Sequence, residues 1–162
     1  MTAEWFDDYL TPLFKVNGAR YFDAEENITA EDIGVLGINL TVCIRGQGQL
    51  LEKIGDEYLI TESDIVSNIE KYYGKNVTYE IDDDQFRYDE TKKRYLSTLE
   101  FGVGCVSEGP EAEYVISNVI SQGNDVTLNV LEDYKGEADN RNYTVSLECY
   151  NDNCIIKSIE EK

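Results

Sequence analysis

The sequence predicts an α+β fold: about three N-terminal helices packed on a curved, mainly antiparallel sheet of five to six C-terminal strands. Apolar residues recur at helical spacing through the first part of the chain, and from residue 77 onward they alternate with polar ones. Two segments, residues 28–33 and 60–65, carry the same helix-start pattern. Residues 142–159 alternate on both sides of a polar, turn-prone tetrad at 150–153, which is typical of a β-hairpin.

The first helix is predicted from residues 3–10, with Thr2 as its N-cap. Thr11 and Pro12 then predict an interruption or a restart of the helix, because proline is tolerated at a first helical position. The apolar stripe that supports this helix is aromatic-rich and comprises Trp5, Phe6, Tyr9, Leu10, Leu13 and Phe14. Such a stripe could line a pocket, but we interpret it as core.

Two further helices follow from their start and stop signals. Thr29 is placed as an N-cap with Asp32 at the third helical position, and this helix is expected to stop at Arg45 and Gly46. Thr61 and Asp64 repeat the pattern, and Gly74 ends the third helix. Between them we expect a short helix at 50–54 and a short strand at 57–60. The apolar face of the second helix comprises Ile33, Leu36, Leu40, Cys43 and Ile44.

The remaining chain is predicted as three hairpins separated by loops. The first pairs residues 85–88 with 94–99 around a charged turn, and residues 101–110 form a loop. The second pairs 114–120 with 126–131 around a turn at 122–124, and a polar loop covers 132–140. Folding the third hairpin at its tetrad sets Cys149 opposite Cys154, Leu147 opposite Ile156 and Val145 opposite Ser158.

The four cysteines suggest two disulfides. In an oxidising compartment Cys149 and Cys154 form the natural pair, because directly opposed hairpin residues lie within disulfide range. That leaves Cys43 with Cys105. The alternative is four reduced thiols in a cytosolic protein. Zinc is not expected, since the cysteine spacings contain no C-x₂-C pair, and we expect no metal and no cofactor.

The net charge of −19, from 33 acidic and 14 basic residues, limits the partners. Such a field repels phosphate backbones and anionic membranes, so no direct nucleic-acid binding is expected, whereas basic partners or cations are favoured. The simplest interpretation is that the charge keeps the protein soluble and monomeric. No apolar run reaches the roughly 18 residues of a membrane span, so we expect no transmembrane segment.

Candidate catalytic groups are few, because the chain contains no histidine. This excludes Ser-His-Asp and Cys-His catalysis, so we expect no enzyme; the alternative is one that uses Asp, Glu or Tyr. Acidic clusters at 82–84 and at Glu132, Asp133, Glu137 and Asp139 offer oxygen ligands to calcium, but neither fits the EF-hand loop. We interpret both as solvated charge.

The segments I-T-E-S-D-I-V-S-N-I-E-K-Y-Y-G and F-R-Y-D-E-T-K-K-R-Y, with the long late strands, resemble small uncharacterised secreted proteins and lipoproteins of Gram-positive bacteria. The element order over residues 28–159 also resembles cystatin-like and nuclear-transport-factor-like folds, in which a curved sheet wraps a long helix. This resemblance implies a pocket between sheet and helices, and it supplies no catalytic residue.

Residues 1–162 are therefore expected to form a single globular domain that serves as a non-enzymatic, extracytoplasmic binding or interaction module. It would offer a mainly aromatic pocket to a small apolar ligand, or a sheet face to a protein. Its N-terminus lacks a secretory signal, so the chain is either a mature secreted form or cytoplasmic. The alternative function is an acidic intracellular inhibitor that mimics nucleic acid and occupies the surface of a basic partner protein.

Overall fold

The computed structural model describes residues 1–45, 52–99 and 110–162 and confirms the α+β class. In these described ranges, eight strands form two antiparallel sheets of four, where the sequence pattern predicts one sheet of five to six strands. The chain divides into two compact units, Met1–Asn27 with Ser107–Lys162, and Ile28–Val106. A single domain over the whole chain stays a prediction. Within the described ranges, no helix is long and apolar enough to cross a membrane.

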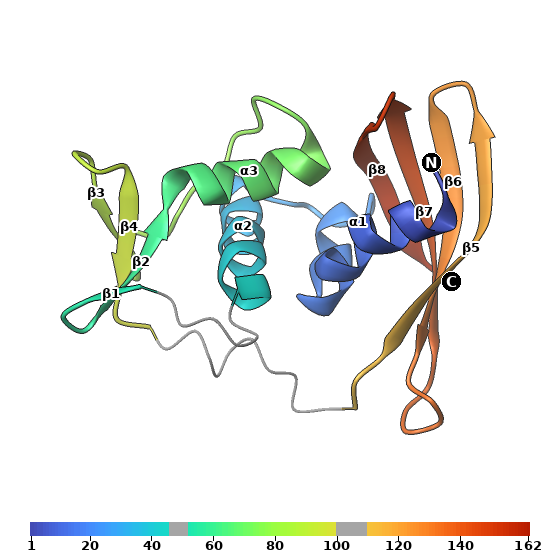
Figure 1. The fold of residues 1–162 in the computed structure, drawn as a ribbon, viewed down its shortest axis with the longest axis horizontal. Coiled ribbons are helices and arrows are strands. Elements are labelled where there is room, and N and C mark those ends of the chain that lie inside the picture. The colour runs from blue at the N-terminus through green and yellow to red at the C-terminus, as the bar shows by residue number, and fades with distance from the viewer. Residues whose placement is uncertain (46–51, 100–109) are drawn as a thin grey trace. The chain divides into compact units, whose positions relative to one another are not determined.

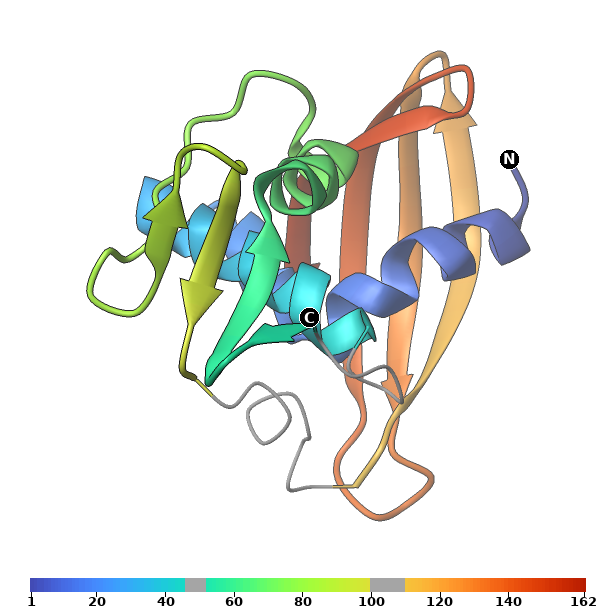
Figure 2. The same ribbon diagram turned by 60° about the vertical axis from the view of Figure 1, so that its left-hand side comes forward.

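The first unit combines the two ends of the chain. Its sheet has the order β5-β6-β7-β8, and helix α1 and the 3₁₀-helix η1 pack on it (Figures 1 and 2). The elements are α1 (Ala3–Lys15), η1 (Gly18–Phe22), β5 (Glu113–Gln122), β6 (Asp125–Asp133), β7 (Arg141–Tyr150) and β8 (Asn153–Glu161). Alternate residues of β6 and β7, such as Leu128 and Val145, are fully buried, as expected for a sheet with one covered face.

Helix α1 begins where the sequence predicts. Thr2 Oγ1 accepts the N–H of Trp5 at 3.2 Å, which confirms Thr2 as the N-cap. The predicted break at Thr11 and Pro12 is wrong, because α1 continues through Pro12 to Lys15. Proline inside a helix removes one backbone hydrogen bond. The helix continues because buried residues before and after Pro12 lie on one face, and their packing compensates for that loss. These buried residues are Phe6, Tyr9, Leu10, Leu13 and Phe14.

The hairpin of β7 and β8 turns at Asn151 and Asp152, and Asn151 has the left-handed φ of 55° that asparagine tolerates. The pairings of Cys149 with Cys154 and of Leu147 with Ile156 are confirmed. The third predicted pairing is wrong: Val145 lies opposite Ile159, one residue beyond Ser158. A register shift next to Ser146 adds one residue to β8, and this brings Ile159 into the core at 2% exposure.

The second unit packs two helices against a small sheet of order β1-β2-β4-β3, with α3 lying across α2 (Figures 1 and 2). Its elements are α2 (Ala30–Arg45), β1 (Lys53–Ile54), β2 (Glu57–Thr61), α3 (Glu62–Tyr73), β3 (Arg87–Asp89) and β4 (Arg94–Ser97). The core lies between helices and sheet and comprises Ile38, Val42, Ile60, Ile65, Ile69 and Phe86.

The short elements of this unit follow the predictions in part. The strand predicted at 57–60 and the hairpin around the turn at 89–93 are confirmed. The short helix predicted at 50–54 is wrong at Lys53 and Ile54, which form strand β1 and pair with β2. The loop predicted at 101–110 lies outside the described residues except for Pro110, as do Gly46 and residues 50 and 51.

The two helix-start patterns behave differently. At α2 the capping box forms: Asp32 N–H donates to Thr29 Oγ1 at 3.2 Å, and Thr29 N–H donates to Asp32 Oδ2 at 2.8 Å. At α3, Thr61 is the N-cap but its side chain makes no capping bond. Its hydroxyl is buried without a partner, and Thr61 also ends strand β2, where it pairs with Arg94. The N–H of Glu62, at the first helical position and out of reach of an N-cap side chain, donates to the Lys93 carbonyl at 3.0 Å. The stop at Gly74 is confirmed, with a left-handed φ of 87°.

Candidate functional site: a pocket beside helix α2

A pocket of about 400 Å³ opens in the second unit between α2 and the segment that leads into β3. This volume lies within the range of small-molecule sites. Its walls come from one side of α2, from residues 80–86 and from Leu99 after β4. The lining residues are Glu31, Gly34, Val35, Ile38, Asn39, Val42, Cys43, Glu80, Ile81, Asp82, Gln85, Phe86 and Leu99.

One wall depends on a glycine. Glu80 N–H donates to the carbonyl of Ala30 at 2.9 Å, which fastens the extended segment to the first turn of α2. At Gly34, one turn further along, a Cβ atom would lie 1.8 Å from the Glu80 carbonyl oxygen. No other residue type fits between this helix and this segment, so Gly34 sets how closely the wall approaches α2.

The other wall is held by a turn and a serine. The Asp82 carbonyl accepts the N–H of Phe86 at 2.9 Å, and Asp82 Oδ1 accepts the N–H of Asp84 at 2.9 Å. Ser97 is buried on β4, where its hydroxyl donates to the Gln85 carbonyl at 2.9 Å and accepts the N–H of Leu99 at 3.1 Å. Ser97 therefore joins two lining segments that lie far apart in sequence.

The pocket is apolar inside and acidic at its edge. Ile38, Val42 and Phe86 belong to the buried core of the unit, and Val35 is 43% exposed. Carboxylates come from Glu31 and Glu80, which are exposed, and from Asp82, which is half-buried. Neither lysine nor arginine occurs among the described lining residues. The predicted pocket is mainly aromatic; in this one Phe86 supplies the aromatic surface, and the other apolar lining is mostly aliphatic.

Cys43 links the pocket to the predicted disulfides. Its side chain is half-buried, lines the pocket, packs against the core and is disulfide-bonded. Its predicted partner, Cys105, lies outside the described residues, as does the side chain of Ile44, which was predicted on the same face. Cys43 was predicted to point inward, and its contacts with the core agree.

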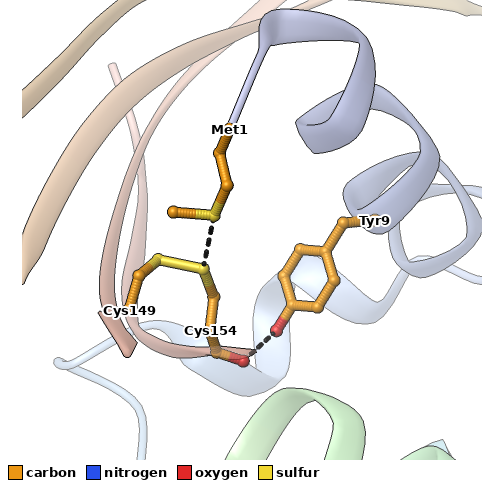
Figure 3. Close-up of a disulfide and its surroundings, with 4 residues drawn as sticks. All are labelled: Met1, Tyr9, Cys149 and Cys154. Atoms are coloured by element: carbon orange, nitrogen blue, oxygen red, sulfur yellow. Dashed lines mark hydrogen bonds between the residues drawn. A yellow bond between two sulfur atoms is a disulfide. The ribbon is translucent and has the colours of Figure 1, made fainter. Parts of the chain in front are cut away.

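The disulfide between Cys149 and Cys154 is confirmed, with an S–S distance of 2.02 Å and a Cα separation of 4.1 Å. Figure 3 shows that it lies beneath the N-terminal part of α1, where Tyr9 Oη donates to the Cys154 carbonyl at 2.9 Å. Met1 Sδ lies 3.4 Å from Cys154 Sγ. The disulfide therefore joins β7 and β8 at the turn end of their hairpin, and α1 contacts the same end through Tyr9.

Each unit also contains a carboxylate among tyrosines. In the first unit Glu132 is 8% exposed and accepts the hydroxyls of Tyr114 at 3.3 Å and Tyr143 at 3.2 Å. Burial raises the pKa of both phenols, and the charge of Glu132 raises it further; at Tyr143 a hydrogen bond with Arg141 opposes this rise. Both phenols are therefore protonated donors near neutral pH, and the hydrogen bonds that they donate satisfy this buried carboxylate.

Glu62 is the corresponding carboxylate of the second unit. Its Oε2 accepts the hydroxyl of Tyr88 at 2.9 Å, and the ring of Tyr88 packs on Tyr95 with centroids 4.8 Å apart. Burial raises the pKa of Tyr95 to about 12, with the charges of Tyr79 and Glu62 as further causes. Burial and Glu62 also raise the pKa of Tyr79.

The second acidic cluster considered for calcium is placed differently from the prediction in part. Glu132 and Asp133 lie on β6 and not in the following loop. Asp133 forms an ion pair with Lys135 at 3.2 Å, whereas Glu132 faces the core. Across residues 1–45, 52–99 and 110–162, no three or more Cys, Asp or Glu side chains gather as a metal site requires.

Cys43 and Asp82 stand out in the sequence as a disulfide candidate and as part of an acidic cluster, but nothing local marks any lining residue as part of a pocket. Gly34 is required by the close approach of the Glu80 backbone, which lies 46 positions later in the chain. Ser97 looks in the sequence like an ordinary strand residue. A signal for Glu132 did exist. The alternation of Val126, Leu128 and Val130 continues to residue 132, and it predicts a carboxylate on the buried face.

Comparison of the chain with protein-family models, with curated protein sequences and with solved structures found no match.

Proposed function

We propose that this protein is a non-enzymatic, extracytoplasmic binding domain, and that the pocket beside α2 takes a small apolar ligand. The pocket carries the proposal: about 400 Å³ of space with Ile38, Val42 and Phe86 at its base. Apolar surface gains roughly 25 cal/mol per Å² on leaving water, so a ligand that covers these side chains has a driving force without any catalytic group.

The extracytoplasmic location is supported by the cysteines. Cys149 and Cys154 are bonded across a hairpin, and Cys43 in the pocket wall is disulfide-bonded as well. Structural disulfides persist in oxidising compartments and are rare in reducing ones. A disulfide at Cys43 would also hold the pocket wall in place after secretion.

Binding of Nile red, a neutral apolar dye excited outside the absorption of the protein, tests the proposal. We expect saturable fluorescence enhancement with one site per chain. Val35→Trp fills the mouth of the pocket from an exposed position of α2 and should abolish most of this signal. Ile54→Trp is the matched control, because Ile54 is 47% exposed on β1 of the same unit and does not line the pocket.

Two outcomes would overturn the proposal. Fluorescence that rises without saturation would mean that the dye finds no defined site. Equal binding by Val35→Trp and Ile54→Trp would place the dye elsewhere on the protein. Far-UV circular dichroism of both variants checks that the fold is retained before either result is interpreted.

A further inference from the structure

We propose that the pocket selects an amphiphilic cation, a ligand with an apolar tail and a protonated amine head. The inference rests on the proposed function, since it assigns the charge of the ligand that the same pocket would take. It comes from the contrast between the apolar base of the pocket and the carboxylates at its edge.

The tail is assigned by the base of the pocket. Ile38, Val42 and Phe86 are each less than 8% exposed and belong to the core of the unit. A charged group placed against these side chains would lose its hydration without gaining a partner. The inner part of the ligand is therefore apolar.

The head is assigned by three carboxylates that protein cations do not neutralise. Glu31, Glu80 and Asp82 line the pocket, and in the described parts of the chain no lysine or arginine forms an ion pair with any of them. Asp83 and Asp84 follow Asp82 in the sequence and are exposed. The charged side chains that an ammonium group meets in the described lining are all carboxylates, and at this exposed edge it keeps part of its hydration.

A ligand of the opposite charge is disfavoured by the same geometry. A carboxylate head would lie among like charges in a protein whose net charge is already −19. A neutral head would gain the apolar contacts alone. Because these acids are at the surface, each should contribute modestly, and together they should favour the cation over the neutral ligand by about 3- to 10-fold at low salt.

Three probes with the same eight-carbon tail test the charge: octylammonium, 1-octanol and octanoate, titrated at neutral pH while the amide chemical shifts of the second unit are followed by NMR. We expect octylammonium to bind most tightly and octanoate most weakly, with shifts concentrated in the described pocket segments. The preference for octylammonium over 1-octanol should shrink at 0.5 M salt, because screening weakens charge attraction.

Two matched triple variants separate the pocket from the overall charge. Glu31→Gln with Glu80→Gln and Asp82→Asn should remove the preference for octylammonium while the affinity for 1-octanol stays unchanged. Glu137→Gln with Asp139→Asn and Asp152→Asn changes the net charge equally at exposed positions of the other unit. This control should retain the preference.

The outcomes distinguish the two levels of the proposal. Equal affinities for octylammonium and 1-octanol, or equal loss of preference in both triple variants, would overturn the charge assignment and leave the apolar site standing. Failure of all three probes to shift any pocket amide would overturn the proposed function itself.

Discussion

Replacing Gly34 with alanine tests whether the pocket wall depends on the close approach of Glu80 to α2. The added Cβ would lie 1.8 Å from the Glu80 carbonyl oxygen, whereas real Cβ atoms essentially never come within 3.0 Å of a neighbour. The clash is with backbone, so no side-chain rotation relieves it. Residues 80–82 must therefore move away from α2 by about 1.2 Å, the difference between 3.0 and 1.8 Å.

The energetic consequence combines three effects. Moving the segment stretches the 2.9 Å hydrogen bond from Glu80 N–H to the Ala30 carbonyl, and such a bond contributes about 0.5–1.5 kcal/mol. Overpacking adds about 1–3 kcal/mol. Alanine favours the helix over glycine by about 1 kcal/mol, and this stabilisation offsets part of the loss. We therefore expect Gly34→Ala to lower the free energy of unfolding by about 0.5–3.5 kcal/mol.

Gly37→Ala is the control, because it lies on the same helix and brings the same gain in helix preference. Its Cβ would meet Cδ1 and Cγ1 of Ile69 at 2.8 Å and Cγ2 of Ile65 at 3.0 Å, so it crowds buried side chains of the core and leaves the backbone of the pocket wall untouched. Urea unfolding followed by circular dichroism gives the free energies, and hydrogen exchange at Glu80 reports the wall directly. If Gly34→Ala matches the wild type in both measurements, the close approach does not constrain the wall.

Two further predictions concern the disulfide and the tyrosines. Replacing both Cys149 and Cys154 with serine should lower the free energy of unfolding by about 2 kcal/mol, the chain-entropy value for a link of this length, and an unchanged urea midpoint would contradict it. Raising the pH should destabilise the fold from about pH 10 to 12, because the unfolded chain releases phenol protons near pH 10 while folded Tyr95 holds its proton to about 12. Unfolding midpoints and the absorbance of tyrosinate measured from pH 9 to 12 check this, and a constant midpoint would refute it.

The sequence predicted well where the stabilising contact joins residues a few positions apart. Thr2 and Thr29 cap their helices through N–H groups three residues away, and the pairing of Cys149 with Cys154 follows from a two-residue turn. In these cases the hydrogen-bond or covalent partners are visible in one short stretch of chain. The α+β class was predictable for the same reason, because the spacing of apolar residues, 3.6 in a helix and two in a strand, is a local property of the sequence.

The tertiary structure decided those features that depend on contacts between residues far apart in the sequence. Thr61 has the same pattern as Thr29, but it also ends strand β2, where it pairs with Arg94 of β4, and its side chain makes no capping bond. An added residue in β8 turns Ile159 inward, because burying its side chain requires the shift in register. The strands form two sheets, and the pocket needs Gly34, Glu80 and Ser97 to be brought together across the fold. Composition alone determined the charge of −19, and only the folded chain places three of those carboxylates around an apolar pocket, because such proximity depends on long-range packing.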